Sequence, residues 1–166
     1  MKFHGRAHKF GNDVNTDYII SGKYKFKTLD MKELAKHVME DLDPEFSQKV
    51  QQGDFIVAGS NFGCGSSREQ APLAIINADV GAVLAKSFAR IFYRNAINTG
   101  LPVIECDTDR IQPGDELDIN LEGGVIKNLT QGTEIPIIPL PKVMLQILAD
   151  GGLAPHFRRY GGFHFE

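Results

Sequence analysis

Residues 54–106 read DFIVAGSNFGCGSSREQAPLAIINADVGAVLAKSFARIFYRNAINTGLPVIEC, and this stretch decides the fold. Three short apolar runs that contain β-branched residues alternate with two longer segments of helical character. Apolar runs of this kind are typical of strands buried on both faces, and the connections are long enough to be helices. The alternation predicts a parallel α/β core with strands at 54–60, 81–87 and 101–106 and helices at 66–79 and 88–100.

The chain that precedes this core predicts one strand, a polar loop and two short helices. Residues 2–10 are predicted as the strand, and the loop that follows contains the turn-forming sequence GNDVNTD. Asp30 is a suitable N-cap for a helix that extends to about Met39. A second short helix is predicted over 44–50, because its first residue, Pro44, is favoured at the start of a helix.

The chain that follows Cys106 is rich in predicted strands. The segments ELDINL, GVIKNL and TEIPIIPL are separated by GG and QG turns, and each is predicted as a strand. A last helix at 141–150 ends at two glycines, and an aromatic, basic tail, HFRRYGGFHF, completes the chain. We therefore predict one compact α/β domain over residues 1–166, with a parallel strand–helix core and a β-rich C-terminal part.

The composition excludes several classes of protein. The chain has 166 residues, of which 42% are hydrophobic and 23% charged, so it is neither disordered nor fibrous. Its net charge is −3 and it has no basic block, which argues against non-specific nucleic-acid binding. No apolar run approaches the roughly 18–20 residues of a membrane span, and the polar start lacks the apolar core of a signal peptide. We expect a cytoplasmic protein that binds neither nucleic acid nor membranes.

The number of cysteines and the spacing of the histidines predict no metal or cluster site within this chain. The two cysteines, Cys64 and Cys106, are too few for a disulfide scaffold, a four-cysteine zinc site or an iron–sulfur cluster. Both are interpreted as reduced thiols. The five histidines lack the spacing of metal ligands and are interpreted as structural or exposed: His4, His8, His37, His156 and His164.

The segment 59–69, GSNFGCGSSRE, is the strongest candidate for a functional site. It joins a predicted buried strand to a predicted helix, and such a junction gathers free backbone N–H groups that attract anions. Gly63 and Gly65 allow dihedral angles and close backbone approaches that a side chain would obstruct. Arg68 adds a planar group that can bind a carboxylate through two hydrogen bonds. The segment predicts an anion-binding site.

A purely structural interpretation of the same residues stands beside this one. Ser66 and Glu69 match the S-x-x-E capping box of a helix N-terminus, and Ser67 with Gln70 fits the same template one residue later. A dinucleotide-binding loop is disfavoured, because Arg68 occupies the position of the third glycine. The segment also lacks the lysine of a Walker A motif.

The sequences NFGCGSSREQAP and AKSFARIFYRNAINTGLPVI, together with the earlier NTDYIISGKY, resemble one known family. They are similar to the small subunits of 3-isopropylmalate dehydratase, which correspond to the swivel domain of the aconitase superfamily. The similarity extends from about Phe10 to Gly152, and the pair GSSRE and KSFARI is specific to the family. The resemblance implies a three-layer β/β/α swivel domain. It also implies a hydro-lyase that removes water from a hydroxylated di- or tricarboxylate and adds it back on the neighbouring carbon.

The resemblance assigns roles to four residues. Ser66 matches the serine alkoxide that removes a C–H proton, and Ser67 and Arg68 match positions that hold substrate carboxylates. Asp17 matches an active-site aspartate that orients or charges the acid group of the partner; an Asx-turn or loop cap is the structural alternative for this residue. The positive potential near Arg68 and the predicted helix N-terminus is of the kind that a serine base requires.

The loop that follows Asp17 is expected to choose the substrate, as it does in the family. The residues concerned are Tyr24, Lys25, Phe26 and Lys27, and they resemble the KFR of aconitase, with Lys27 where that arginine binds substrate. The two lysines can recognise a carboxylate or can simply be solvated, and Phe26 can equally line an apolar pocket. The resemblance favours isopropylmalate as the substrate, with homoaconitate, citramalate and dimethylmalate as the alternatives.

The resemblance also implies a partner. A separate large subunit would carry a [4Fe–4S] cluster, which two cysteines cannot hold, and the assembled enzyme would serve leucine biosynthesis. Self-association of isolated small subunits is left open, and Arg90 and Arg94 are predicted on one helix face as a surface or subunit contact. Two alternatives of other classes are a stand-alone anion- or nucleotide-binding regulatory module and a thiol enzyme dependent on Cys64.

Overall fold

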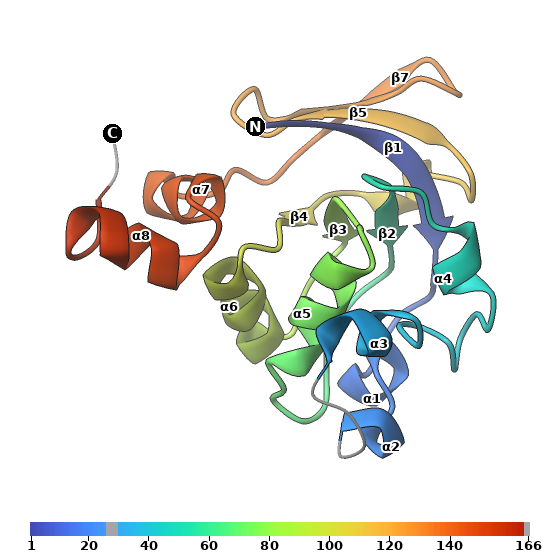
Figure 1. The fold of residues 1–166 in the computed structure, drawn as a ribbon. Helices are drawn as coiled ribbons and strands as arrows, with labels where there is room; N and C mark the ends of the chain where they lie inside the picture. The colour runs from blue at the N-terminus through green and yellow to red at the C-terminus, as the bar shows by residue number, and fades with distance from the viewer. Residues whose placement is uncertain (26–29, 165–166) are drawn as a thin grey trace.

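The computed structural model describes residues 1–25 and 30–164. In these residues one mixed sheet contains seven strands in the order β4-β3-β2-β1-β5-β6-β7 (Figure 1). The strands are β1 (Lys2–Lys9), β2 (Phe55–Val57), β3 (Ala82–Ala85), β4 (Val103–Glu105), β5 (Glu116–Asn120), β6 (Val125–Asn128) and β7 (Thr133–Pro136). Every strand predicted from the sequence is present, and each is shorter than its predicted run.

Strand β1 belongs to both halves of the sheet. Its C-terminal part pairs in parallel with β2, where Ala7 faces Phe55, and its N-terminal part pairs antiparallel with β5, where Arg6 faces Glu116. Strands β2 and β3 are buried along their whole length, whereas burial alternates along β5. This difference is expected, because a parallel sheet is covered on both faces and an antiparallel sheet can expose one.

The two edges of the sheet meet beyond the ends of β4 and β7. Cys106 and Ile137 form an isolated antiparallel bridge, and the N–H of Ile138 donates to the carbonyl oxygen of Glu105 at 3.0 Å. The sheet is therefore curled into a half-barrel, with its antiparallel half above the parallel half in Figure 1. The predicted α/β fold class, a parallel strand–helix core with a β-rich C-terminal part, is confirmed.

Helices cover the parallel half of the sheet. Figure 1 shows α3, α5 and α6 on the same side of it, and buried side chains of these helices and of β2 to β4 share one core. None of the described helices has the length and apolarity that a bilayer-spanning helix requires. The helices are α1 (Thr16–Ile19), α2 (Gly22–Lys25), α3 (Met31–Ala35), α4 (Phe46–Lys49), α5 (Gln70–Asn77), α6 (Arg90–Thr99), α7 (Lys142–Ala149) and α8 (Leu153–Tyr160), with a 3₁₀ turn at Thr108–Arg110.

Two predicted helix ends are confirmed. The Asp30 carboxylate accepts the N–H of Lys32 at 2.9 Å and caps α3. Helix α6 ends at Gly100, which has a φ of 92°. Glycine is favoured there because this left-handed conformation strains other residues, and because a Cβ would lie 2.6 Å from the carbonyl oxygen of Gly151.

Three helix predictions were wrong in extent. Helix α3 ends at Ala35 rather than near Met39, and Met39 itself has a φ of 60°, which a right-handed helix cannot contain. Helix α4 covers only the middle of the predicted segment 44–50. Helix α5 begins at Gln70 rather than at 66, so the two serines lie in the loop before it.

The aromatic C-terminal tail forms a helix that the sequence did not predict. Helix α8 follows two glycines and packs against α6 and α7. Its His156 is fully buried, and the ring Nδ1 lies 2.7 Å from a carboxylate oxygen of Asp150 at the end of α7. This buried polar pair ties α8 to the end of α7, a tertiary contact that the local sequence does not indicate. The same hydrogen bond holds the pKa of the Asp150 carboxyl below its ordinary value.

Candidate active site

Two loops that follow β1 and β2 run side by side. Because these strands are parallel neighbours, their carboxyl ends meet at one edge of the sheet. The N–H of Asp13 donates to the carbonyl oxygen of Ser60 at 2.8 Å, and the N–H of Gly63 donates to that of Val14 at 2.8 Å. We call residues 11–18 and 59–69 the paired loops. Their contact brings together the sequence motifs NTD and GSSRE, which are about fifty positions apart.

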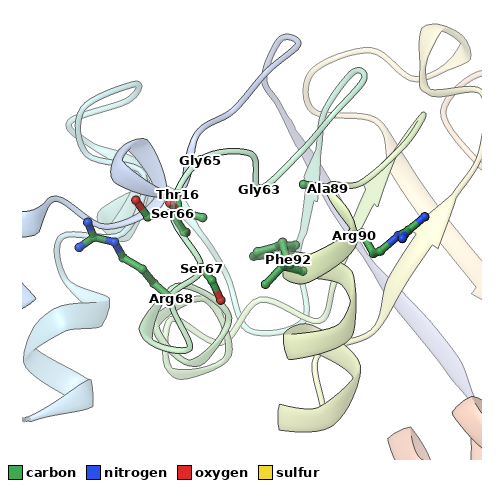
Figure 2. A pocket seen from close by; sticks show the side chains of 10 residues that line it. Thr16, Gly63, Gly65, Ser66, Ser67, Arg68, Ala89, Arg90 and Phe92 are labelled. Atoms are coloured by element: carbon green, nitrogen blue, oxygen red, sulfur yellow. Dashed lines mark hydrogen bonds between the residues drawn. The ribbon is translucent and has the colours of Figure 1, made fainter.

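A cavity of about 270 Å³ opens between the paired loops and the start of α6 (Figure 2). Ser66 and Ser67 are exposed at this cavity rather than buried in apolar packing, so a ligand can reach both hydroxyls. The cavity lies at the carboxyl ends of β2 and β3, where ligands of α/β proteins are commonly bound. It is lined by Thr16, Gly63, Gly65, Ser66, Ser67, Arg68, Ala89, Arg90, Ile91 and Phe92.

Two glycines give the second loop its path. Gly63 and Gly65 have φ angles of 83° and 93°, as the sequence predicted. A Cβ on Gly63 would lie 2.2 Å from Cγ of Phe92, and a Cβ on Gly65 would lie 2.6 Å from Oδ1 of Asn15. Both positions therefore need glycine for dihedral angle and for space.

The predicted capping box is not formed. The N-cap position of α5 is Glu69, and no side chain makes a capping hydrogen bond there. The hydroxyl oxygen of Ser67 instead accepts a hydrogen bond from the side-chain amide of Asn95 on α6, with an N–O distance of 3.4 Å. The serines are therefore available to a ligand, and capping does not explain them.

Arg68 and Asp17 meet across the paired loops. One guanidinium nitrogen of Arg68 lies 3.6 Å from a carboxylate oxygen of Asp17, in the first turn of α1. The N-cap of α1 is Asn15, whose side chain accepts the N–H of Asp17 at 2.9 Å, and the two roles weighed for Asp17 stay predictions. In Figure 2 the guanidinium of Arg68 and that of Arg90 point away from each other, on opposite sides of the cavity.

The thiols show no arrangement for metal or covalent chemistry. Cys106 is buried, and burial, aided by the nearby Asp107 carboxylate, raises the pKa of its thiol to about 12. Cys64 is half-buried and its backbone bridges to Asn15. The described residues contain no group of three or more His, Cys, Asp or Glu side chains arranged for a metal ion. The side chains of the described residues do not fit an iron–sulfur cluster.

The sequence profile of the aconitase C-terminal domain family matches residues 9–109, which include both paired loops. The chain belongs to this family. Members of the family are similar to it over nearly the whole length. The 3-isopropylmalate dehydratase small subunit 2 of Archaeoglobus fulgidus is 59% identical over 97% of this chain and 98% of its own length. The methanogen homoaconitase small subunit of Methanothermobacter thermautotrophicus is 56% identical over 92% of this chain and 89% of its own.

A solved structure of the family has the same fold. The crystal structure of 3-isopropylmalate dehydratase (LeuD) from Methanocaldococcus jannaschii superposes with a TM-score of 0.93 and is 50% identical. The match covers 97% of this chain and 96% of that one. The family resemblance recognised from the sequence, and the swivel-domain fold it implied, are confirmed.

The loop expected to choose the substrate within this family lies only partly in the described structure. Tyr24 and Lys25 end the short helix α2, close in sequence to α1 and Asp17. Phe26 and Lys27 lie outside the described residues. The substrate-binding roles given to these four residues therefore stay predictions.

Sequence reasoning missed three residues of this aconitase-type site. Thr16 stands inside the NTD motif but was not singled out, although it lines the cavity. Phe92 and Asn95 come from α6, and their contribution depends on the packing of this helix against the second loop. Arg90 and Arg94 are exposed as predicted, and Arg90 also lines the cavity.

Proposed function

We propose that this chain is the small subunit of a 3-isopropylmalate dehydratase, which interconverts 2-isopropylmalate and 3-isopropylmalate by dehydration and rehydration. The observation that carries the proposal is an exposed serine, Ser66, two residues from an arginine on the wall of a small cavity. The names and the high identity of the relatives support it, as does a match over nearly their full length. The activity would serve leucine biosynthesis in the cytoplasm.

Ser66 would remove the C–H proton next to a substrate carboxylate. The Ser66 hydroxyl makes no hydrogen bond in the described part of the chain, so its Oγ is free to accept this proton as an alkoxide. An alkoxide requires positive potential around it. The Arg68 guanidinium and the free backbone N–H groups that precede α5 supply that potential.

Ser67 and Arg68 would hold substrate carboxylates. The guanidinium offers two parallel N–H donors, which match the two oxygens of a carboxylate. Asp17 lies 3.6 Å from this group, which is close enough to orient it and too far for a strong competing hydrogen bond. We therefore assign two roles to Asp17. It would orient the Arg68 guanidinium, and it would contact the acid group of the partner.

The large subunit would cover this cavity and carry the [4Fe–4S] cluster. Such a cluster would supply Lewis-acid chemistry toward a hydroxylated carboxylate. The small subunit would contribute the proton-transfer group and the carboxylate contacts, so neither polypeptide would be active alone.

Reconstitution tests this division. We expect the isolated chain to dehydrate none of four acids, 3-isopropylmalate, homoaconitate, citramalate and dimethylmalate. Mixing with the cluster-loaded large subunit from the same source should give turnover of 3-isopropylmalate. For each acid, the rate of turnover is measured from the absorbance of the unsaturated intermediate that dehydration forms.

The same panel separates the alternatives. Preference for homoaconitate would instead support a homoaconitase small subunit, which the 56% identity to such a relative brings into consideration. Micromolar binding of a nucleotide by the isolated chain, with no turnover in any mixture, would contradict the proposal in favour of a regulatory module.

Arg68→Gln is expected to lower kcat/KM of the reconstituted enzyme roughly 100-fold, mainly through KM. The glutamine removes the charge and one of two donors, and hydrogen bonds to charged groups each contribute about 1.5–3 kcal/mol. Arg94→Gln is the matched control, because Arg94 is exposed on α6 and does not line the cavity. Equal steady-state parameters for the two variants would remove Arg68 from the substrate site.

A further inference from the structure

Thr16 makes two hydrogen bonds to the loop that carries Ser66. Its backbone N–H donates to the carbonyl oxygen of Cys64 at 2.8 Å, and its hydroxyl donates to the carbonyl oxygen of Ser66 at 2.9 Å. One residue thus binds the carbonyl groups on both sides of Gly65. Thr16 is itself only 2% exposed, so its hydroxyl has little access to water as an alternative partner.

The segment around Ser66 depends on this contact. Gly65 has the conformational freedom of a glycine and a φ of 93°, and regular structure resumes only at Gln70. Within the described chain, the bond from the Thr16 hydroxyl is the only hydrogen bond to the backbone of residues 65–67. Because the Ser66 hydroxyl has no partner of its own in that part of the chain, its position follows from its backbone.

We propose that Thr16 is a positioning residue for Ser66. Its hydroxyl fixes the peptide group that joins Ser66 to Ser67 and thereby fixes the position of the Ser66 side chain on the cavity wall. In Figure 2 Thr16 and Ser66 lie together at one end of that cavity. The inference rests on the proposed function, in which Ser66 removes the substrate proton.

The hydroxyl of Thr16, rather than its shape, carries this role. Valine has nearly the same volume and fills the same buried space, but it cannot donate to Ser66. Since Ser66 is exposed, its carbonyl group can then turn toward water, and the serine hydroxyl turns with it. Displacement of a reacting group by about 1 Å can cost as much as 100-fold in rate.

The test uses the reconstituted two-subunit enzyme with Thr16→Val and Thr16→Ser. We expect Thr16→Val to lower kcat about 10- to 100-fold while KM and the affinity for the large subunit stay within about twofold of wild type. Thr16→Ser keeps the donor and should restore most of kcat. Failure of the serine variant to do so would overturn the inference.

Thr108→Val is the matched control for loss of a buried threonine hydroxyl. Thr108 is 1% exposed and its hydroxyl donates to the carbonyl oxygen of Ala58 at 2.7 Å, outside the cavity. We expect Thr108→Val to lower the free energy of unfolding and to leave kcat unchanged. If both valine variants lose kcat in proportion to lost stability, Thr16 has only a structural role and the inference is wrong.

A double-mutant cycle separates this inference from the function on which it rests. Adding Thr16→Val to Ser66→Ala should cost no further activity, because the group that Thr16 positions is already gone. An inactive Ser66→Ala enzyme beside a fully active Thr16→Val enzyme would refute the positioning role alone. Near-normal turnover by Ser66→Ala would refute the proposed base, and the positioning role with it.

Discussion

Replacing Ser66 by alanine is expected to lower kcat of the reconstituted dehydratase about 1,000-fold. Removal of a group that transfers a proton in the transition state costs between about 100-fold and 10,000-fold. Ser66 is exposed, and its hydroxyl makes no hydrogen bond in the described chain, so the substitution leaves neither a cavity nor a broken internal contact. Steady-state turnover of 3-isopropylmalate measures the effect, and gel filtration verifies that the two subunits still associate.

Ser60→Ala provides the matched control. Ser60 lies in the same loop, is also exposed, and does not line the cavity. The two variants remove the same atom from the same loop, so general effects of the substitution cancel. If Ser66→Ala turns over substrate at nearly the wild-type rate, Ser66 is not the base, irrespective of the result for Ser60→Ala.

The second large effect is on stability. Gly63→Ala is expected to reduce the free energy of unfolding by about 2–5 kcal/mol, as the sum of two costs. The left-handed conformation at φ 83° costs an alanine about 1–2 kcal/mol. The new Cβ would also lie 2.2 Å from Cγ of Phe92, a buried ring packed on Phe62 and Phe88, and overpacking of this kind costs about 1–3 kcal/mol. Denaturation by guanidinium chloride measures the change.

Gly114→Ala measures the first cost alone, so the difference between the two variants isolates the second. Gly114 has the same φ of 83°, but a Cβ there would meet no atom within 4 Å. This variant should lose only the conformational part, about 1–2 kcal/mol. Equal losses in the two variants would mean that Phe92 moves aside without cost, contrary to the packing described.

Much of the fold follows from residues 54–106. Strands such as Phe55–Val57 and Ala82–Ala85 are buried on both faces, and burial of that kind leaves an apolar run that sequence alone reveals. The closure of the sheet by Cys106 and Ile137 has no such signal, because backbone hydrogen bonds between distant edges do not require particular side chains.

The sequence named several residues of the candidate site, but it did not indicate how they are arranged in space. Arg68 and Asp17 were both named from the sequence, and the parallel pairing of β1 with β2 brings them to within 3.6 Å. The capping box at Ser66 failed because tertiary contacts outweigh local preference: Thr16 and Asn95 hold the loop away from a helical path. Local sequence cannot report partners that lie on other elements.

The paired loops are joined by main-chain hydrogen bonds, as at Asp13 with Ser60, and by side chains, as at Asn12 with Ser60 and Thr16 with Ser66. Main-chain hydrogen bonds are indifferent to the side chains on either residue, so they place no demand of their own on residue type. The left-handed glycines and the side-chain contacts of Asn12, Thr16 and Arg68, in contrast, do depend on residue type. Under the proposed function, a change of acid specificity in the neighbouring loop would leave the contacts that hold Ser66 and Arg68 in place.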